Sequence, residues 1–290
     1  MPELPEVETV RSGLSALLPG RTFASVTHDN EKSFPNAPAD VTVFLLGAKV
    51  VAVKRRAKVL LIELGSNYSL VIHLKMTGQL VFVAPDARFG AGHPNDSLIG
   101  RLPDKSTRVE FTFTDGSKLF FNDQRKFGWV RLLPTAEVPN IDFMKKVGPE
   151  PLDAGFTAEQ FTERLQRRKN TSVKAALLDQ TVIAGVGNIY ADESLWGAKI
   201  HPATRVADVS NAKLHTLFTE LQYVLNLAIQ KGGSSDKNYV NAEGKRGSYL
   251  SFARVFRREG LECPRCGATI VKLRVAGRGT HICPREQVLA

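Results

Sequence analysis

The sequence contains few cysteines and no long apolar segment. Only three of its 290 residues are cysteines, and all three lie at or beyond position 263. An odd number of cysteines in a chain without secretory features argues against a disulfide framework. No run of about 18 apolar residues is present, which argues against a membrane-spanning helix. The first residues also lack the basic-then-apolar pattern of a signal peptide, so we expect a cytoplasmic protein that does not associate with membranes.

Acidic residues are scarce relative to basic ones. The chain has 39 Lys and Arg against 29 Asp and Glu, which gives a formal net charge of +10 and an isoelectric point near 9.6. This balance favours a polyanionic partner, of which nucleic acid is the commonest. A basic globular protein without such a partner is the alternative that charge alone leaves open. The length is sufficient for two domains, at least one of them with a sizeable core.

Hydrophobic periodicity divides the chain into a strand-rich half and a helical half. Apolar residues at helical spacing predict an amphipathic helix over 4–18, and a period of two predicts many short strands from 22 to 133. Asp115-Gly116 lies between two of these strands and predicts a hairpin. The turn-rich segment 84–107 predicts a surface loop or an insertion between strands. The first half therefore indicates an antiparallel sandwich or barrel that follows a helix.

The second half of the chain is helical and ends in a basic module. Thr157 and Gln160 form the pattern of a capping box, and further helical patterns follow, the longest of them capped by Ser210. Between 254 and 285 there are eight Lys and Arg against two acids. The predicted fold class is α+β with two domains, divided as 1–133, a proline-rich linker over 134–155, helices over 156–250 and the basic module over 251–290.

The three cysteines follow the spacing of a zinc ribbon. CPRC, with Cys263 and Cys266, is followed by CPRE, with Cys283, which is the layout of two knuckles that supply four metal ligands. The fourth position is Glu286, and a carboxylate is a harder and weaker ligand than a thiolate in such a site. Glu286 completing a zinc site, His281 replacing it, and a module that has lost its metal are three alternatives that the spacing leaves open.

Two glycine-containing segments predict contacts to an anion. GVGN places Asn188 at the start of a helix, where exposed N–H groups attract phosphate. VAGRG places Arg278 at the tip of a predicted hairpin in the basic module, where it is suited to a phosphate or groove contact. A structural helix junction and a solvated turn arginine are the corresponding alternatives.

Two fragments of the strand-rich half carry residues suited to entering a base stack. HLKMTG places Met76 in a turn, and DQRKFG places Arg125 and Phe127 two residues apart, so that both point the same way from an extended segment. Exposed apolar and cationic side chains of this kind act as wedges in bent DNA. Packing of Met76 and Phe127 in the core is the alternative.

The order of these motifs carries a resemblance to a known family. MPELPEVETVR, RRAK, HLKMTG, DQRKFG, GVGNIYADE and the basic CxxC module occur in the order seen in bacterial formamidopyrimidine-DNA glycosylases, over essentially the whole chain. The resemblance implies a β-sandwich with an N-terminal helix, then a helix-two-turn-helix domain that ends in a zinc-ribbon-like β-hairpin. Glu286 and the long 84–107 segment depart from the family pattern.

The resemblance also assigns a role to the N-terminus. Taken alone, MPELPEVE is an ordinary helix start with acids in the first turn. Within the family pattern, removal of Met1 frees the secondary amine of Pro2, which attacks a sugar carbon as a covalent nucleophile. Glu3 lies beside it to transfer a proton. The positive end of the following helix disfavours the protonated amine.

The resemblance implies further site residues, grouped by role. The implied catalytic residues are Pro2, Glu3, Lys58 and Arg278; the implied DNA contacts are His73, Met76, Arg125, Phe127, Lys174, Asn188, Tyr249 and Arg278; the implied lesion contacts are Glu6, Ser234 and Ser235; the implied metal ligands are Cys263, Cys266, Cys283 and Glu286. Zinc is the implied cofactor, with a structural role.

The implied activity is that of a bifunctional repair glycosylase. A monomer would bind duplex DNA with a damaged base or abasic site, flip the nucleotide out, remove an oxidised purine such as 8-oxoguanine through a Pro2 Schiff base, and cut the strand by β,δ-elimination. Two alternatives remain open, namely the same chemistry on oxidised pyrimidines, and a DNA-binding protein that has lost catalysis.

Overall fold

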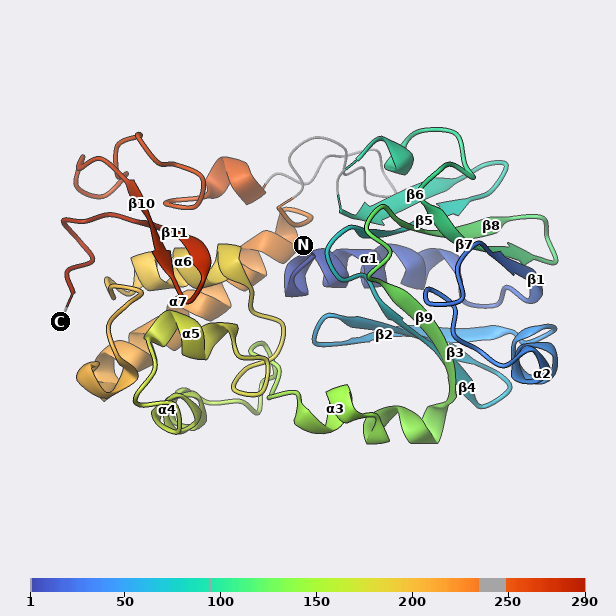
Figure 1. Ribbon diagram of the computed structural model, residues 1–290, viewed down its shortest axis with the longest axis horizontal. Helices are drawn as coiled ribbons and strands as arrows, with labels where there is room; N and C mark the ends of the chain where they lie inside the picture. The colour runs from blue at the N-terminus through green and yellow to red at the C-terminus, as the bar shows by residue number, and fades with distance from the viewer. Residues whose placement is uncertain (1, 94, 235–248, 290) are drawn as a thin grey trace. The chain divides into compact units, whose positions relative to one another are not determined.

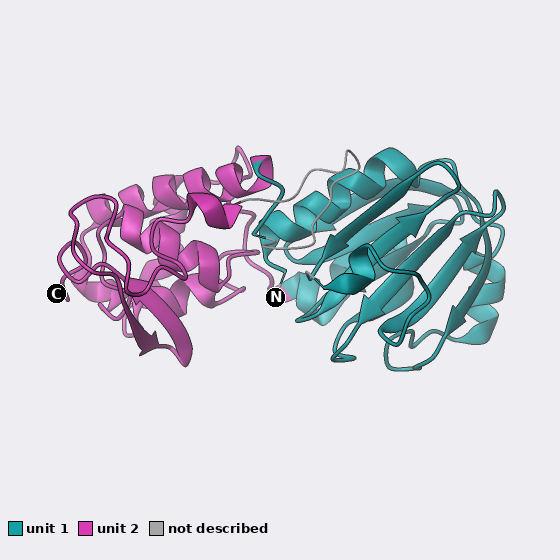
Figure 2. Cartoon of the chain, turned by 90° about the horizontal axis from the view of Figure 1, so that it is seen from above, with its two compact units in different colours: residues 1–145, 231–248 teal, residues 146–230, 249–290 magenta. Residues whose placement is uncertain are grey.

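A computed structural model describes residues 2–93, 95–234 and 249–289, and two compact units account for them. The first unit comprises 1–145 with 231–248, and the second comprises 146–230 with 249–290 (Figure 2). Each unit has its own apolar core. No described helix is long and apolar enough to span a bilayer. The α+β class is confirmed, whereas the finer boundaries at 133, 155 and 250 stay predictions.

The first unit is a sandwich of two antiparallel sheets (Figure 1). One sheet has the strand order β1-β7-β8-β5-β6 and the other β2-β3-β4-β9. The strands are β1 (Phe23–His28), β2 (Val50–Arg56), β3 (Val59–Leu64), β4 (Tyr68–His73), β5 (Gly78–Val83), β6 (Arg88–Gly92), β7 (Thr107–Phe113), β8 (Lys118–Asp123) and β9 (Trp129–Pro134). The hairpin predicted at Asp115-Gly116 joins β7 to β8, and Gly116 has the positive φ of +81° that its turn requires.

Helix α1 (Leu4–Leu17) contacts β2 and β6, which are edge strands of different sheets, so it closes one open side of the sandwich (Figure 1). Its apolar stripe, including Val7, Val10 and Leu14, is fully buried, which confirms the predicted amphipathic helix. Close approach to β6 depends on Gly13, because a Cβ there would lie 2.2 Å from the Phe89 ring. The helix that carries the N-terminus is thereby fixed on both sheets.

The segment 84–107 is more ordered than a surface loop. It contains β6, which pairs with β5, and the short helix η2 (Asp96–Leu98). Phe89 and Ala91 of β6 belong to the sandwich core. The prediction of a loop was wrong here because RFGAG has little β-branched character, and its strand forms through pairing with β5 and packing against α1.

Short helices of the chain up to residue 146 lie between or after the strands of the first unit. In the first unit α2 (Pro38–Asp40) and η1 (Val41–Leu45) lie between β1 and β2. Helices η3 (Thr135–Asn140) and α3 (Asp142–Lys146) follow β9 within the predicted linker.

The second unit is a helical domain with a C-terminal hairpin. Its elements are α4 (Ala158–Gln166), α5 (Val173–Leu178), α6 (Asn188–Gly197), η4 (Val206–Asp208), α7 (Asn211–Gln230), η5 (Tyr249–Phe252), β10 (Val271–Val275) and β11 (Arg278–Ile282). The predicted capping box of Thr157 and Gln160 is present at α4. Strands β10 and β11 form the hairpin predicted for the basic module. Apolar residues of α4 to α7 form the core.

Candidate functional site

The first residues of the chain are buried and held in place at the start of α1. Glu3 is the residue before the helix, and its N–H donates to Glu6 Oε2 at 2.8 Å. The other oxygen of Glu6 accepts from the N–H of Ser234 at 2.8 Å. Glu3 and Glu6 are 2% and 5% exposed, and Pro2 is buried as well. Glu6 therefore fixes the Pro2–Glu3 segment and the start of the segment after α7 with one carboxylate.

Lys58 lies in the tight turn between β2 and β3. Ala57 takes a positive φ of +53° in this turn, and its carbonyl accepts from Arg55 Nη1 at 2.8 Å. Arg55 Nε also donates to Glu8 of α1 at 2.9 Å, so the turn is tied to the helix that carries the N-terminus. The Lys58 side chain is 7% exposed. Its position thus depends on contacts within the first unit.

His73 is a neutral imidazole in this structure. Burial and the positive charges of Lys75 and Lys58 lower the pKa of His73 to about 3. The N–H of Lys75 donates to His73 Nδ1 at 3.0 Å, which leaves the ring proton on Nε2. The ring packs against Trp129 and Phe143. His73 can therefore donate one hydrogen bond, as a phosphate contact requires.

A single carboxylate holds both predicted wedge loops. Asp123 is fully buried and accepts from the hydroxyl of Thr77, next to Met76, and from the N–H of Arg125 at 3.2 Å. Its second oxygen accepts from the N–H groups of Phe127 at 2.8 Å and Gly128 at 2.7 Å. Asp123 is not among the predicted site residues, although it is the first residue of the DQRKFG motif and the last residue of β8.

The wedge side chains themselves differ in exposure. Phe127 is 52% exposed, which contradicts the alternative of core packing for this residue, while Met76 is half-buried. Arg125 is exposed, and its guanidinium lies 4.7 Å from the centre of the Phe127 ring. Arg125 and Phe127 therefore present a cation and an aromatic ring together from one loop.

In the second unit, Asn188 and Arg278 lie on neighbouring elements. Asn188 is the first residue of α6, and its Nδ2 donates to the carbonyl of Gly279 in β11 at 2.9 Å. Ala276 and Gly277 both have positive φ at the hairpin tip, and Arg278 follows them as an exposed residue. A cleft of about 510 Å³ lies beside this contact, with Asn188, Lys272 and Gly279 in its lining.

Polar side chains, most of them buried, connect α5 and α6 to the hairpin. Lys174 is 0% exposed, and its Nζ donates to Asp192 Oδ1 at 2.5 Å and to Thr280 Oγ1 at 2.7 Å. Asp192 Oδ2 accepts from the N–H of His281 at 3.0 Å, and His281 Nε2 lies 3.0 Å from Glu259. The polar contacts of the His281 side chain are therefore with Asp192 and Glu259, and His281 is not part of the cysteine cluster. Lys174 is enclosed by protein and holds the strand that carries Arg278.

Tyr249 is a predicted DNA contact, and Ser234 and Ser235 are predicted lesion contacts; the structure describes Tyr249 and Ser234. Tyr249 is 1% exposed in the core of the second unit, and burial beside the Glu193 carboxylate raises its pKa above the ordinary value. Glu193 also accepts from the N–H groups of Val255 and Phe256, which anchors the segment before the cysteine module. Ser234 contacts Glu6 as described, whereas Ser235 lies outside the described residues.

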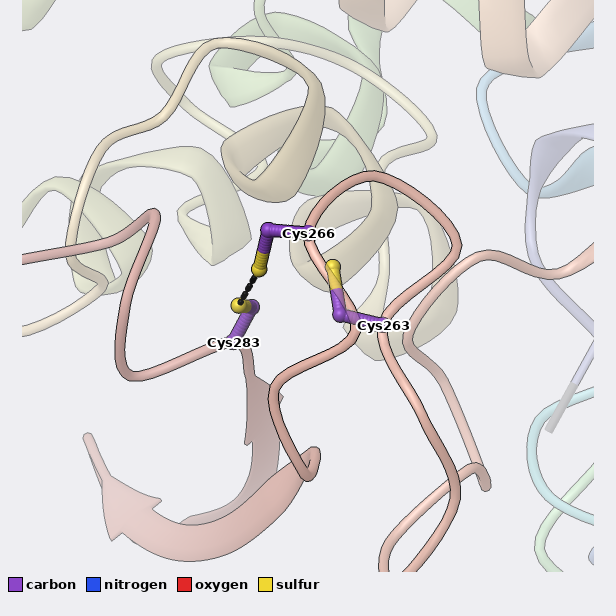
Figure 3. A group of neighbouring side chains, drawn as sticks. All are labelled: Cys263, Cys266 and Cys283. Carbon is purple, nitrogen blue, oxygen red and sulfur yellow. Dashed lines mark hydrogen bonds between the residues drawn. The ribbon is translucent and has the colours of Figure 1, made fainter.

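Cys263, Cys266 and Cys283 converge, with their sulfurs all within 4.8 Å of one another (Figure 3). Burial raises the pKa of the Cys283 thiol to about 11. Burial acts in the same direction at Cys263, but hydrogen bonds from the N–H groups of Arg265 and Cys266 and from the side chains of Trp196 and Cys283 together outweigh it and bring the pKa of Cys263 to about 7. Three soft, largely buried sulfurs fit a structural zinc ion, which would cross-link the two knuckles. The carboxylate of Glu286 is not part of this cluster.

Comparisons with known proteins cover nearly the whole chain. Residues 1–130 match the family described as formamidopyrimidine-DNA glycosylase N-terminal domain. Residues 147–239 match its H2TH domain, and residues 260–285 match a zinc finger found in FPG and IleRS. The curated formamidopyrimidine-DNA glycosylase of Latilactobacillus sakei is 39% identical over 288 residues, 99% of this chain and 98% of that protein.

Solved structures give the same result. The complex of Lactococcus lactis Fpg with DNA containing an abasic site is 35% identical, has a TM-score of 0.86 and covers 99% of each chain. A complex of MutM with DNA containing carbocyclic 8-oxo-G is 35% identical, has a TM-score of 0.85 and covers 99% of this chain and 100% of that one.

Proposed function

The chain belongs to the formamidopyrimidine-DNA glycosylase family, and from this premise we propose which of its residues carry out the reaction. The protein is a DNA glycosylase that repairs oxidised purines and also cleaves abasic sites. We propose that it acts as a monomer in the cytoplasm on duplex DNA containing a damaged base or an abasic site. The position of Pro2 and Glu3, buried and fixed by Glu6 at the start of α1, is the observation that carries the assignment of the nucleophile.

Pro2 acts as the nucleophile once Met1 has been removed. Its secondary amine attacks C1′ of the flipped nucleotide, the glycosidic bond breaks, and the base leaves with the bonding electron pair and takes up a proton. Glu3 protonates the ring oxygen, so that the sugar opens to an iminium on Pro2. β-Elimination then breaks the C3′–O bond and δ-elimination breaks the C5′–O bond, and Lys58 assists these proton transfers.

The remaining residues hold the DNA. Met76, Arg125 and Phe127 fill the space left by the flipped nucleotide, and Asp123 positions them. His73 donates from Nε2 to a phosphate, and Asn188 and Arg278 bind phosphates from the second unit. Lys174 and Tyr249 support DNA binding through the elements that they hold, since both are enclosed by protein. Ser234 and Ser235 contact the lesion.

An incision assay tests this function. We expect cleavage of duplexes with 8-oxoguanine or formamidopyrimidine, with much slower cleavage of a thymine glycol duplex. Preference for thymine glycol would support the pyrimidine alternative instead. Binding without any cleavage would support the decayed alternative. Glu3→Gln should retain DNA binding while it loses base removal, whereas Glu163→Gln on the exposed face of α4 should behave like the wild type.

A further inference from the structure

Glu286 occupies the position where the second knuckle would supply a fourth ligand, but its side chain is engaged elsewhere. Its Oε2 lies 2.8 Å from Lys199 Nζ and 3.2 Å from Arg265 Nη1. The hydrogen bond from Lys199 is the main cause that holds the pKa of Glu286 below its usual range. Among the described residues, the sulfurs of Cys263, Cys266 and Cys283 form a group that could hold a metal ion, and Glu286 is not a member of it.

The partners of Glu286 are themselves fixed. Arg265 lies between the first two cysteines, and its guanidinium carbon is 3.8 Å from the centre of the Trp196 ring. It also donates to the carbonyls of Trp196 at 3.2 Å and Gly197 at 3.3 Å, at the end of α6. Lys199 follows α6 with a positive φ of +56°. A guanidinium held by stacking and two carbonyls loses little further freedom when it binds a carboxylate.

Gln287 strengthens the same connection. It is 1% exposed, its Oε1 accepts from the N–H of Cys283 at 3.0 Å, and its Nε2 donates to the carbonyl of Ile200 at 2.9 Å. The residues after Cys283 therefore bind to the segment 196–200 through one ion-pair network and one buried amide. In a four-cysteine ribbon the residue at position 286 would instead be a zinc ligand.

We propose that this chain binds zinc through three thiolates and leaves the fourth position to water or another small ligand, while Glu286 locks the second knuckle to the end of α6 through Lys199 and Arg265. Soft sulfur donors favour zinc over hard cations. The Glu286 carboxylate already accepts charge-assisted hydrogen bonds from Lys199 and Arg265, and binding the metal would require it to give these up. The module thereby retains its attachment to the helical domain with one thiolate fewer. This inference concerns the metal site and is independent of the proposed catalytic residues.

Zinc affinity measured by chelator competition, together with the metal content per chain, shows whether Glu286 is a zinc ligand or only a structural contact to Lys199 and Arg265. We expect about one zinc per wild-type chain and a dissociation constant raised by no more than about tenfold in Glu286→Gln, whereas Cys263→Ser should lose zinc and Glu286→Cys should bind it at least about tenfold more tightly. Loss of zinc from Glu286→Gln to the extent seen for Cys263→Ser would show that Glu286 is a ligand and would overturn the proposal. A wild-type chain that binds no zinc would also overturn it.

Cobalt(II) substitution tests the open position directly. Imidazole added to the cobalt-loaded wild-type protein should shift its visible d–d absorption, because an exchangeable ligand occupies the fourth site. The same addition should leave Glu286→Cys unchanged, since a fourth thiolate closes the site. A wild-type spectrum that does not respond to imidazole would contradict the open position.

A double-mutant cycle tests the lock. Glu286→Gln and Lys199→Met should each lower the unfolding temperature of the zinc-loaded protein, and the double variant should lose less than the sum of the two. The matched cycle on the exposed pair Glu163 and Arg167 of α4 should show no such coupling. Additive effects at Glu286 and Lys199 would show that the ion pair does not hold the knuckle.

Discussion

At the scale of single residues, three buried carboxylates fix backbone rather than bind solvent. Glu6 accepts from the N–H groups of Glu3 and Ser234, and Glu193 accepts from N–H groups of the segment before the cysteine module. Asp123 accepts from N–H groups of the Arg125–Phe127 loop and from the Thr77 hydroxyl of the Met76 loop. Carboxylates that accept backbone N–H groups in this way are costly to replace, because each donor would be left buried without a partner. Substitution of Asp123 or Glu193 should therefore disturb function, although neither carboxylate is proposed to contact DNA.

Replacement of Asp123 should loosen both wedge loops. In Asp123→Asn an NH₂ group would replace one of the two acceptor oxygens, at the cost of about 2 kcal/mol in the free energy of unfolding. Urea unfolding measures this loss, and incision kinetics should show a higher KM for lesion DNA. Asp153→Asn is the control, since Asp153 accepts from the N–H of Gly155 in an exposed loop and uses one oxygen for it. Equal stability of the two variants would contradict this role of Asp123.

The low pKa of His73 makes the free energy of unfolding depend on pH. The folded pKa of about 3 is below the unfolded value of about 6.5, so the unfolded chain binds the proton first as the pH falls. The His73 contribution is therefore complete above about pH 6.5 and is lost as the pH falls towards 3. Between pH 7 and pH 5 we expect the wild type to lose roughly 1–2 kcal/mol more than His73→Asn in urea unfolding. Identical pH profiles of the two proteins would contradict a neutral, buried His73.

At the scale of elements, α1 is the part of the fold that positions the proposed nucleophile. In Gly13→Ala the new Cβ would clash with Phe89, so α1 would have to move away from β6. We expect a loss of about 1–3 kcal/mol in the free energy of unfolding and slower base removal. Ser12→Ala on the exposed side of the same helix should change neither. Wild-type stability of Gly13→Ala would show that α1 is not held tightly by β6.

The contact between Gly13 of α1 and Phe89 of β6 is an example of what could not be predicted from the sequence. The helix, the Asp115-Gly116 hairpin and the capping box of α4 follow from short patterns, and all three are present. The strand β6 and the need for glycine at position 13 depend on each other across the first unit, and neither has a local signal. Pairing with β5 and packing on α1 decide them.

At the scale of the whole molecule, the motifs of the chain are divided between two units. The first unit contains Pro2, Glu3, Lys58 and the wedge loops, and the second contains Asn188, Arg278 and the cysteine cluster. The order of the motifs was sufficient to predict the family and its activity on oxidised purines, whereas the catalytic roles of individual residues stay predictions. It was insufficient for Glu286, because the sequence shows a missing cysteine but not the cations that bind its replacement. Buried positioning residues such as Asp123 and Asp192 were missed for the same reason, since their role depends on donors from distant segments.

Trapping of the covalent intermediate tests the central claim most directly. Reduction with borohydride during reaction with an 8-oxoguanine duplex should link the DNA to the nitrogen of Pro2, and peptide mass mapping should place the adduct on the N-terminal peptide. The adduct should be absent in Pro2→Gly and in protein that retains Met1. An adduct on Lys58, or full incision by Pro2→Gly, would contradict the assignment of Pro2 as the nucleophile.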